Sequence, residues 1–163
     1  MKRFLPVLLL FLISCSHSYY IVRHAEKATQ AANMSSDVPL SDKGKERAEA
    51  LKEVLKNKKI SYIFSTNTIR TKSTAQPIAD YLGLQIESYG PIPDETFITK
   101  LRSLKKDVLI VGHSNTVDDI VNMLCKRKEV AGDLPDTAYS KLFIVTVKGK
   151  KTSFKEEHIP SHN

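Results

Sequence analysis

The sequence is poor in the features that mark disulfide-rich, membrane-spanning and metal-binding proteins. It contains only two cysteines, Cys15 and Cys125, which leaves no intramolecular disulfide if Cys15 carries another modification. Its apolar run at residues 4–13 is shorter than the roughly 20 residues that a membrane-spanning helix needs. No carboxylate cluster or histidine spacing suits a metal site, and there is no internal repeat or linker. With 41% hydrophobic and 26% charged residues, the chain reads as one ordinary globular domain.

Charge is abundant, and its distribution argues against a nucleic-acid partner. Lysine and arginine number 25 against 18 acidic residues, which gives a formal net charge of +7. The lysines are scattered, mostly at expected helix ends, without interleaved aromatic residues or a recognisable binding motif. We therefore expect no nucleic-acid partner, and the positive charge instead suits solubility and an anionic surface or substrate.

The first fifteen residues have the pattern of a secretory signal, with a basic start followed by a short apolar run. The segment Leu12-Ile13-Ser14-Cys15 resembles the lipobox of bacterial lipoproteins, in which the cysteine is lipidated. We therefore expect a signal peptide at residues 1–14, lipidation of Cys15, and a short tether over residues 15–18. This predicts a lipid-anchored, extracytoplasmic protein of the bacterial cell envelope, with Cys125 as a buried core thiol. An ordinary signal peptide, or an apolar terminus that happens to contain a cysteine, is the alternative.

From residue 19 onward, short β-rich runs alternate with amphipathic helical segments. Strands are expected at about residues 19–23, 60–64, 84–88, 108–111 and 142–147, with a weak edge strand at 151–159. Helices are expected at about residues 42–57, 69–82, 94–104 and 116–126. This alternation predicts a three-layer α/β/α sandwich with a mostly parallel sheet, formed by one domain over residues 19–163. The polar stretch 29–38 is expected to be a loop over one end of the sheet.

Residues that suit phosphate chemistry follow three of the expected strands. Arg23 and His24 follow the first strand, Arg70 lies in the first turn of the helix after the second, and His113 follows the strand at 108–111. Ligands bind beyond the carboxyl ends of parallel strands, so these side chains are expected to meet at one edge. Guanidinium groups bind phosphate oxygens, and nearby positive charge keeps an imidazole neutral and nucleophilic. The second imidazole can donate to the phosphoryl oxygens as charge builds there.

Four segments, in order, resemble the histidine phosphatase superfamily, also called phosphoglycerate mutase-like. The segment from Tyr20 to Glu26 resembles the Arg-His-Gly signature that opens the family. The other matching segments are Pro39–Gly44 with Arg47-Ala48, Phe64-Ser65 with Arg70 and Thr74-Ala75, and Val111–Ser114. Together they span roughly residues 19–120. Ala25 stands where many members have glycine, and Thr66 stands where a second serine is commoner.

The resemblance implies a phosphatase that uses no metal or other cofactor. His24 would be the nucleophile and form a phosphohistidine that water hydrolyses, while Arg23, Arg70 and His113 would hold the phosphoryl group. The expected substrate is a phosphorylated small molecule or another phosphomonoester of the cell envelope. Two alternatives stay open: a catalytically silent phosphate- or phosphosugar-binding lipoprotein, and a protein phosphohistidine phosphatase.

The general acid is open at this stage. Larger relatives supply a glutamate after the third strand, and Asp94 and Glu95 occupy roughly that region here, with Glu87 just before them. Asp94 and Glu95 could equally favour a helix N-terminus. Small phosphohistidine phosphatases of the family do without an obvious acid because their leaving group is better. The substrate class therefore depends on this point.

The expected anchor also predicts an orientation. Three residues separate Cys15 from the expected first strand, a reach of about 10 Å at most. The phosphate site lies at the opposite, carboxyl end of that strand. We therefore expect the mouth of the site to face away from the anchoring membrane.

Overall fold

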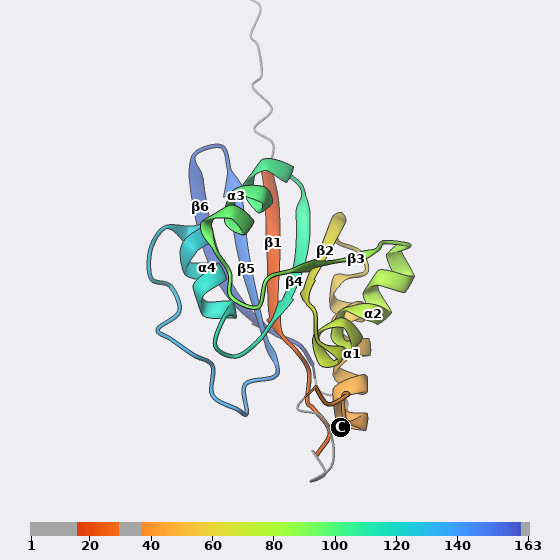
Figure 1. Ribbon diagram of the computed structural model, residues 1–163. Coiled ribbons are helices and arrows are strands. Elements are labelled where there is room, and N and C mark those ends of the chain that lie inside the picture. The colour runs from red at the N-terminus through yellow and green to blue at the C-terminus, as the bar shows by residue number, and fades with distance from the viewer. Residues whose placement is uncertain (1–15, 30–36, 161–163) are drawn as a thin grey trace, which may run out of the picture.

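The computed structural model describes residues 16–29 and 37–160, which form six strands and four helices (Figure 1). In chain order they are β1 (Ser16–Arg23), α1 (Asp42–Leu55), β2 (Ile60–Thr66), α2 (Ile69–Leu82), β3 (Ile86–Tyr89), α3 (Glu95–Leu104), β4 (Asp107–Gly112), α4 (Val117–Cys125), β5 (Lys141–Lys148) and β6 (Lys151–His158). The expected signal peptide and lipidation site, residues 1–15, and most of the expected loop at 29–38 lie outside the described residues. A chain that starts at Ser16 contains every described element of the fold.

The six strands form one mixed sheet in the order β3-β2-β4-β1-β5-β6. Strands β3, β2, β4 and β1 are parallel to one another, whereas β5 is antiparallel to β1 and β6 is antiparallel to β5. The sheet is therefore parallel through its centre, as expected, and antiparallel at one side. None of the helices described here is both long enough and apolar enough to cross a membrane.

Two hydrophobic clusters, one on each face of the sheet, form the core. Tyr19 and Ile21 of β1 belong to the cluster that includes α3 and α4. Tyr20 and Val22 belong to the cluster that includes α1 and α2. Successive side chains of a strand point to opposite faces, so β1 contributes to both layers. This arrangement confirms the three-layer α/β/α sandwich and explains why β1 is apolar over residues 19–22 and β4 over residues 108–111.

The helix ends follow local side-chain signals. The Ser41 hydroxyl accepts a hydrogen bond from the backbone N–H of Gly44 at the start of α1. The Thr68 hydroxyl accepts one from Thr71 at the start of α2, and Gly83 ends this helix in the left-handed conformation. Such caps satisfy backbone groups that the helix itself leaves unpaired. The bounds of α2 are those that the sequence predicted.

The first strand is longer than expected, which corrects the short tether over residues 15–18. β1 begins at Ser16 rather than at residue 19, and residues 16–18 pair with the end of β5. The backbone N–H of Ser18 donates to the Asp107 carboxylate over 2.8 Å, and its hydroxyl lies 2.9 Å from that of Thr146. The polar composition of residues 16–18 concealed the strand, because apolar periodicity does not report strand pairing.

The parallel strands give the domain two distinct ends. At the amino pole, β1, β2 and β4 begin and the turn between β5 and β6 lies beside them, at the top of Figure 1. At the carboxyl pole, the same three strands end at Arg23, Thr66 and Gly112. All the residues with expected roles in phosphate chemistry follow strands at the carboxyl pole.

Candidate active site

The structure brings the four expected site residues together at the carboxyl pole. The rings of His24 and His113 have their centroids 5.5 Å apart. A terminal guanidinium nitrogen of Arg70 lies 3.5 Å from Nδ1 of His113. The Arg23 guanidinium lies 4.3 Å from the centre of the Tyr139 ring, which is itself 6.1 Å from the His24 ring. Three separate segments thus supply two imidazoles and two guanidinium groups to one site.

The His24 ring is buried and held in one tautomer. Its Nδ1 lies 2.8 Å from the backbone oxygen of Ala25, and a carbonyl oxygen only accepts, so Nδ1 donates the proton. In the neutral ring, Nε2 then keeps a free lone pair. Burial lowers the pKa of His24 to about 4, and the positive charges of Arg23 and Arg70 act in the same direction, against the Ala25 hydrogen bond. His24 is therefore neutral at neutral pH, with the lone pair of Nε2 available.

The His113 ring is oriented by a threonine network. Its Nε2 lies 2.8 Å from the Thr66 hydroxyl, which donates its own proton to the Thr71 hydroxyl over 3.0 Å. Nε2 must therefore carry the proton, and Nδ1 is left as an acceptor facing Arg70. Burial lowers the pKa of His113 to about 4, and the charges of Arg70 and Arg23 lower it further.

Both arginines of the site already hold carboxylates. Arg23 is 5% exposed and donates to the backbone oxygen of Pro135 over 2.9 Å and to the Asp136 carboxylate over 3.2 Å. Arg70 donates to the Asp37 carboxylate over 3.3 Å. The buried Nε of Arg23 has no hydrogen-bond partner among the described residues. Because carboxylate and phosphate oxygens bind guanidinium in the same way, these contacts mark an anion site.

Close backbone packing holds the loops of the site in place. A Cβ atom on Gly112 would lie 2.7 Å from the Tyr89 hydroxyl, so only glycine fits between β4 and that side chain. The next residue, His113, donates its backbone N–H to the Thr116 hydroxyl over 3.1 Å. The backbone N–H of His24 donates to the Gly112 carbonyl over 2.9 Å. The two histidine-bearing loops are therefore bonded directly to each other.

An ion pair supports the first loop from α1. The Glu26 carboxylate accepts from two nitrogens of Arg47, over 2.6 and 2.8 Å. Gly44 packs so closely on the Glu26 backbone that a Cβ atom there would overlap the carbonyl oxygen. Glu26 therefore positions the loop that carries His24 through a contact with α1.

The two acidic residues that the sequence offered as general acid do not contact the site residues. The Asp94 carboxylate accepts from the backbone N–H of Phe97 over 2.8 Å and caps α3. Glu95 is exposed in the first turn of the same helix. None of the described hydrogen bonds or ion pairs joins either residue to Arg23, His24, Arg70 or His113. Asp94 thus has the capping role that the sequence allowed, and the identity of the acid stays open.

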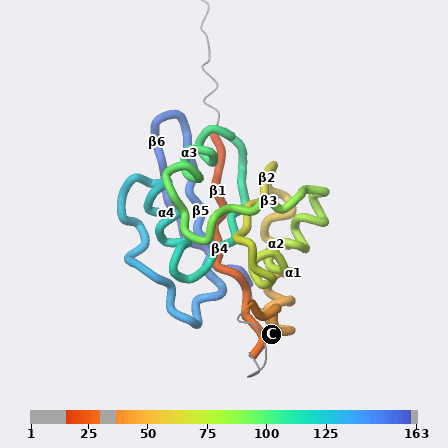
Figure 2. The backbone as a smooth tube through the Cα atoms, in the orientation of Figure 1, coloured from red at the N-terminus to blue at the C-terminus, as the bar shows by residue number. Residues whose placement is uncertain are grey.

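Sequence reasoning missed the part of the site contributed by the segment between α4 and β5. Residues 126–140 run from the amino pole back to the carboxyl pole, down the left side of Figure 2, because β5 begins there. The backbone N–H of Leu134 donates to Ser114 over 2.8 Å, which docks this segment beside His113. It supplies Asp136 and Tyr139 to Arg23. This segment could be placed beside the site only by knowing that β5 is antiparallel to β1, and the sequence pattern does not report the direction of a strand.

Within residues 16–29 and 37–160, no group of three histidine, cysteine or acidic side chains could hold a metal ion. The expectation of a metal-independent, cofactor-free site stays a prediction. Cys125 is 6% exposed, and burial raises the pKa of its thiol. It lies in the α3–α4 core cluster, as expected for a structural cysteine.

Comparisons with known proteins define the class of the domain. The family described as "Histidine phosphatase superfamily (branch 1)" matches residues 19–90. The chain is 33% identical over 103 residues to "Probable phosphoglycerate mutase GpmB" of Citrobacter koseri, a match that covers 61% of this chain and 44% of that protein. The protein of the same name from Salmonella choleraesuis is 36% identical over 93 residues, covering 55% of this chain and 39% of that protein. The chain thus spans less than half the length of these curated relatives.

Solved structures agree on the fold. The protein histidine phosphatase SixA, complexed with tungstate, superposes with a TM-score of 0.69 at 22% identity and covers 86% of this chain and 96% of that chain. Phosphoglycerate mutase from Bacillus anthracis superposes with a TM-score of 0.64 at 15% identity, covering 88% and 93% of the two chains. At these identities the likeness shows the fold alone. Residues 19–90 of the chain match the histidine phosphatase superfamily, and the fold is phosphoglycerate mutase-like.

Proposed function

We propose that this chain is a phosphatase that hydrolyses a phosphomonoester through a phosphohistidine on His24. The observation that carries the proposal is the fixed, neutral His24 ring beside a second imidazole and two arginines. The Ala25 carbonyl holds the proton on Nδ1, so Nε2 is the nucleophilic atom. An activated nucleophile within reach of groups that stabilise developing charge is what covalent phosphoryl transfer needs.

In the first step, the substrate phosphoryl group replaces the carboxylates on the guanidinium groups of Arg23 and Arg70. Nε2 of His24 attacks phosphorus, the N–P bond forms and the P–O bond to the leaving group breaks. The leaving oxygen takes a proton from water or from an acid. The negative charge that enters with the substrate raises the pKa of His113, so this ring can bind a proton at Nδ1 and donate it to a phosphoryl oxygen.

In the second step, water attacks phosphorus and the N–P bond breaks, which regenerates His24 and releases inorganic phosphate. The proton of the attacking water leaves with phosphate or solvent. Throughout both steps the Nδ1 proton stays on the hydrogen bond to Ala25, and this stabilises the phosphohistidine. Arg23 and Arg70 remain charged at any working pH and hold the transferring group in line.

Two alternatives belong with this proposal. A phosphohistidine phosphatase is favoured by one specific observation, since Asp94 and Glu95 make no described contact with the site and a departing imidazole needs less help from an acid. A silent phosphate-binding lipoprotein predicts anion binding without turnover. Hydrolysis rather than mutase chemistry is also part of the proposal.

The test is hydrolysis of an aryl phosphate by the chain from Ser16 onward, in the presence of a chelator. Wild type is compared with His24→Ala and with His158→Ala, which removes an exposed histidine of β6. Chelator-resistant turnover that is lost only in His24→Ala is the expected result. Turnover that needs a metal would refute the metal-independent mechanism. Phosphate that raises the melting temperature without any turnover would favour the binding lipoprotein.

The proposal includes an extracytoplasmic location with a lipid anchor on Cys15, and this part rests on residues 1–15 of the sequence alone. Bacteria expressing the full chain are labelled with a fatty acid that carries a detectable tag. We expect labelled wild-type protein in the membrane fraction, no label in Cys15→Ser, and normal labelling in the matched control Cys125→Ser. Equal labelling of both cysteine variants would refute the anchor.

A further inference from the structure

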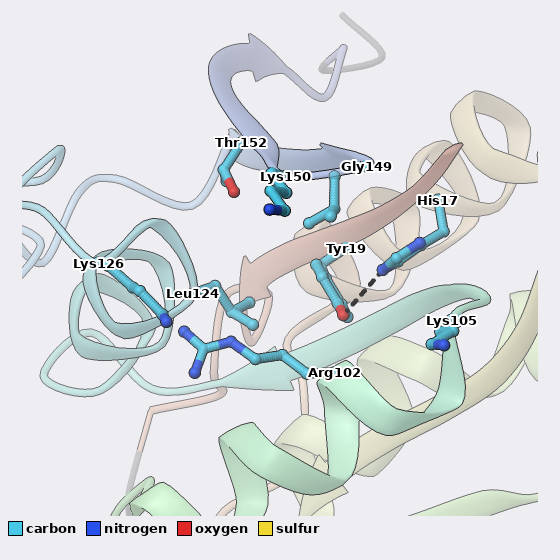
Figure 3. A pocket seen from close by; sticks show the side chains of 10 residues that line it. His17, Tyr19, Arg102, Lys105, Leu124, Lys126, Gly149, Lys150 and Thr152 are labelled. Carbon is cyan, nitrogen blue, oxygen red and sulfur yellow. Dashed lines mark hydrogen bonds between the residues drawn. The ribbon is translucent and has the colours of Figure 1, made fainter. Parts of the chain in front are cut away.

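A pocket of about 540 Å³ lies at the amino pole, at the other end of the domain from the site around His24 (Figure 3). Five of its lining side chains are basic: His17, Arg102, Lys105, Lys126 and Lys150. No acidic side chain is among the described residues that line it. Figure 3 shows Arg102 and Lys126 reaching toward the same space, below the turn that carries Lys150.

The basic side chains come from four separate parts of the fold. His17 is on β1, Arg102 is in the last turn of α3, and Lys150 is in the turn between β5 and β6. Lys105 and Lys126 follow the ends of α3 and α4, both with a positive φ angle that usually favours glycine. A cation near a helix C-terminus is favourable in itself, which accounts for Arg102, Lys105 and Lys126. It does not account for His17 and Lys150.

The positive charge of the pocket is not neutralised within the described structure. None of the described ion pairs includes Arg102, Lys105, Lys126 or Lys150. The Arg102 guanidinium donates to the backbone oxygen of Met123 over 2.6 Å instead of to a carboxylate. The nearby Asp107 carboxylate accepts the backbone N–H of Ser18.

On the opposite face, by contrast, lysines of α1 are paired with glutamates one turn earlier. Lys52 binds Glu49, and Lys56 binds Glu53. Lysines with and without an acidic partner thus both occur on this chain. The amino-pole pocket is distinguished by Arg102 and Lys126, which reach toward the same space, where an anion would fit.

We propose that this pocket binds the phosphate of an anionic phospholipid headgroup and that the amino pole lies against the bilayer. Further exposed lysines lie at the same pole, before β2, before β4 and beside the turn between β5 and β6. They are Lys58, Lys59, Lys106, Lys148 and Lys151. A free phosphate ion would contact only the pocket, whereas a bilayer surface contacts the whole pole and uses all of these charges.

The position of the chain start supports the same occupant. Ser16, the first residue of β1, pairs with Lys148 at the amino pole. The residue before it is Cys15, the expected lipidation site. A headgroup in the pocket and an acyl chain on Cys15 would hold the same pole against one leaflet, and the site around His24 would face away from it. The pocket does not depend on the anchor, so each can be tested alone.

The expected size of the effect follows from the charge near the surface. Each lysine close to an anionic leaflet strengthens binding by about 1 kcal/mol, which is about fivefold. Removing Lys105, Lys126 and Lys150 together should therefore weaken vesicle binding by roughly a hundredfold. Surface charge farther than about 8 Å from the lipid is screened at physiological salt, so lysines elsewhere should matter much less.

The experiment measures cosedimentation of the chain from Ser16 onward with vesicles at physiological ionic strength. One set contains phosphatidylglycerol mixed with phosphatidylcholine, and the other contains phosphatidylcholine alone. The triple variant Lys105→Ala, Lys126→Ala, Lys150→Ala is compared with a control that loses the same charge elsewhere. The control substitutions are Lys45→Ala, Lys72→Ala and Lys155→Ala. Melting temperature and aryl phosphate turnover check that both variants keep the fold.

We expect binding to the anionic vesicles only, a loss of roughly a hundredfold in the pocket variant, and a loss of less than about fivefold in the control. Equal binding to neutral vesicles, or equal losses in the two variants, would overturn the proposal. Release of the wild type from vesicles by inorganic phosphate, but not by chloride at the same ionic strength, would show that the pocket takes free phosphate rather than lipid.

Discussion

The contact between Thr66 and His113 can be broken by a substitution that barely changes the shape of the side chain. In Thr66→Val, a methyl group replaces the hydroxyl that accepts the His113 Nε2 proton over 2.8 Å. Thr66 is 1% exposed, so water cannot take the place of the hydroxyl. The ring can then change to the tautomer with the proton on Nδ1, and that proton would face the Arg70 guanidinium, 3.5 Å away. The orientation of His113 is therefore lost together with one of its hydrogen bonds.

The magnitude has two parts. An intramolecular hydrogen bond contributes about 0.5–1.5 kcal/mol net, so losing the one that positions His113 should lower kcat/KM by about two- to tenfold. Leaving buried polar groups unpaired costs about 1–3 kcal/mol of stability. For a domain of this size, each kcal/mol lowers the melting temperature by about 2–4 °C. The variant should thus stay folded at 25 °C while its activity drops.

The assay is steady-state hydrolysis of an aryl phosphate by wild type, Thr66→Val and Thr66→Ser, with melting temperatures from circular dichroism. Serine keeps the hydroxyl, so Thr66→Ser should retain most of the wild-type kcat/KM. The pH profile adds a readout that simple loss of packing would not move, because only the valine variant changes the protonation of His113. Wild-type activity in a folded Thr66→Val, or an equal loss in Thr66→Ser, would refute the role of this hydroxyl.

Two further predictions concern pH and the carboxylate at Arg23. The pKa of His24 is about 4 in the folded chain against 6.5 for an ordinary histidine, so the unfolded chain binds more protons between these pH values. The free energy of unfolding should therefore be highest above about pH 6.5 and fall by a few kcal/mol toward pH 4, with a smaller fall in His24→Asn. Thermal melts in which wild type and His24→Asn lose the same stability would contradict this. Asp136→Ala frees the Arg23 guanidinium from a partner that is 96% exposed. Since such an ion pair contributes at most about 1 kcal/mol, KM for an aryl phosphate should fall by up to about fivefold, and an unchanged or higher KM would show that Asp136 does not compete with substrate.

Much of the fold could be predicted because its signals are local. The helix α2 has a threonine cap before it and a glycine after it, and both signals are legible in the sequence. The apolar run of β4 indicates a strand that is covered on both faces. The direction of β5 and the strand character of residues 16–18 depend on pairing between distant segments. Local periodicity does not report such pairing, and for this reason residues 16–18 were expected to belong to the tether rather than to β1.

The site divides in the same way. Arg23, His24, Arg70 and His113 each follow an expected strand, so topology alone brought them to one edge. The partners of these residues could not be predicted. Asp136 reaches Arg23 because the chain returns to the carboxyl pole before the antiparallel strand β5, and the Thr66 hydroxyl contacts His113, which follows a neighbouring strand. Asp94 shows the opposite case, in which one residue suited both a catalytic and a capping role. The hydrogen bond from the backbone N–H of Phe97 to its carboxylate shows that Asp94 has the capping role.

The two edge strands of the sheet, β3 and β6, affect how readily neighbouring chains associate. An exposed strand edge can pair with a neighbouring chain and begin aggregation. Here one edge is β3, with four residues, and the other is β6, whose sequence Lys-Thr-Ser-Phe-Lys-Glu-Glu-His is rich in charge. A short edge gives a neighbour few hydrogen bonds, and a charged edge must lose hydration before it can pair. Chains concentrated in a two-dimensional layer would therefore resist joining edge to edge.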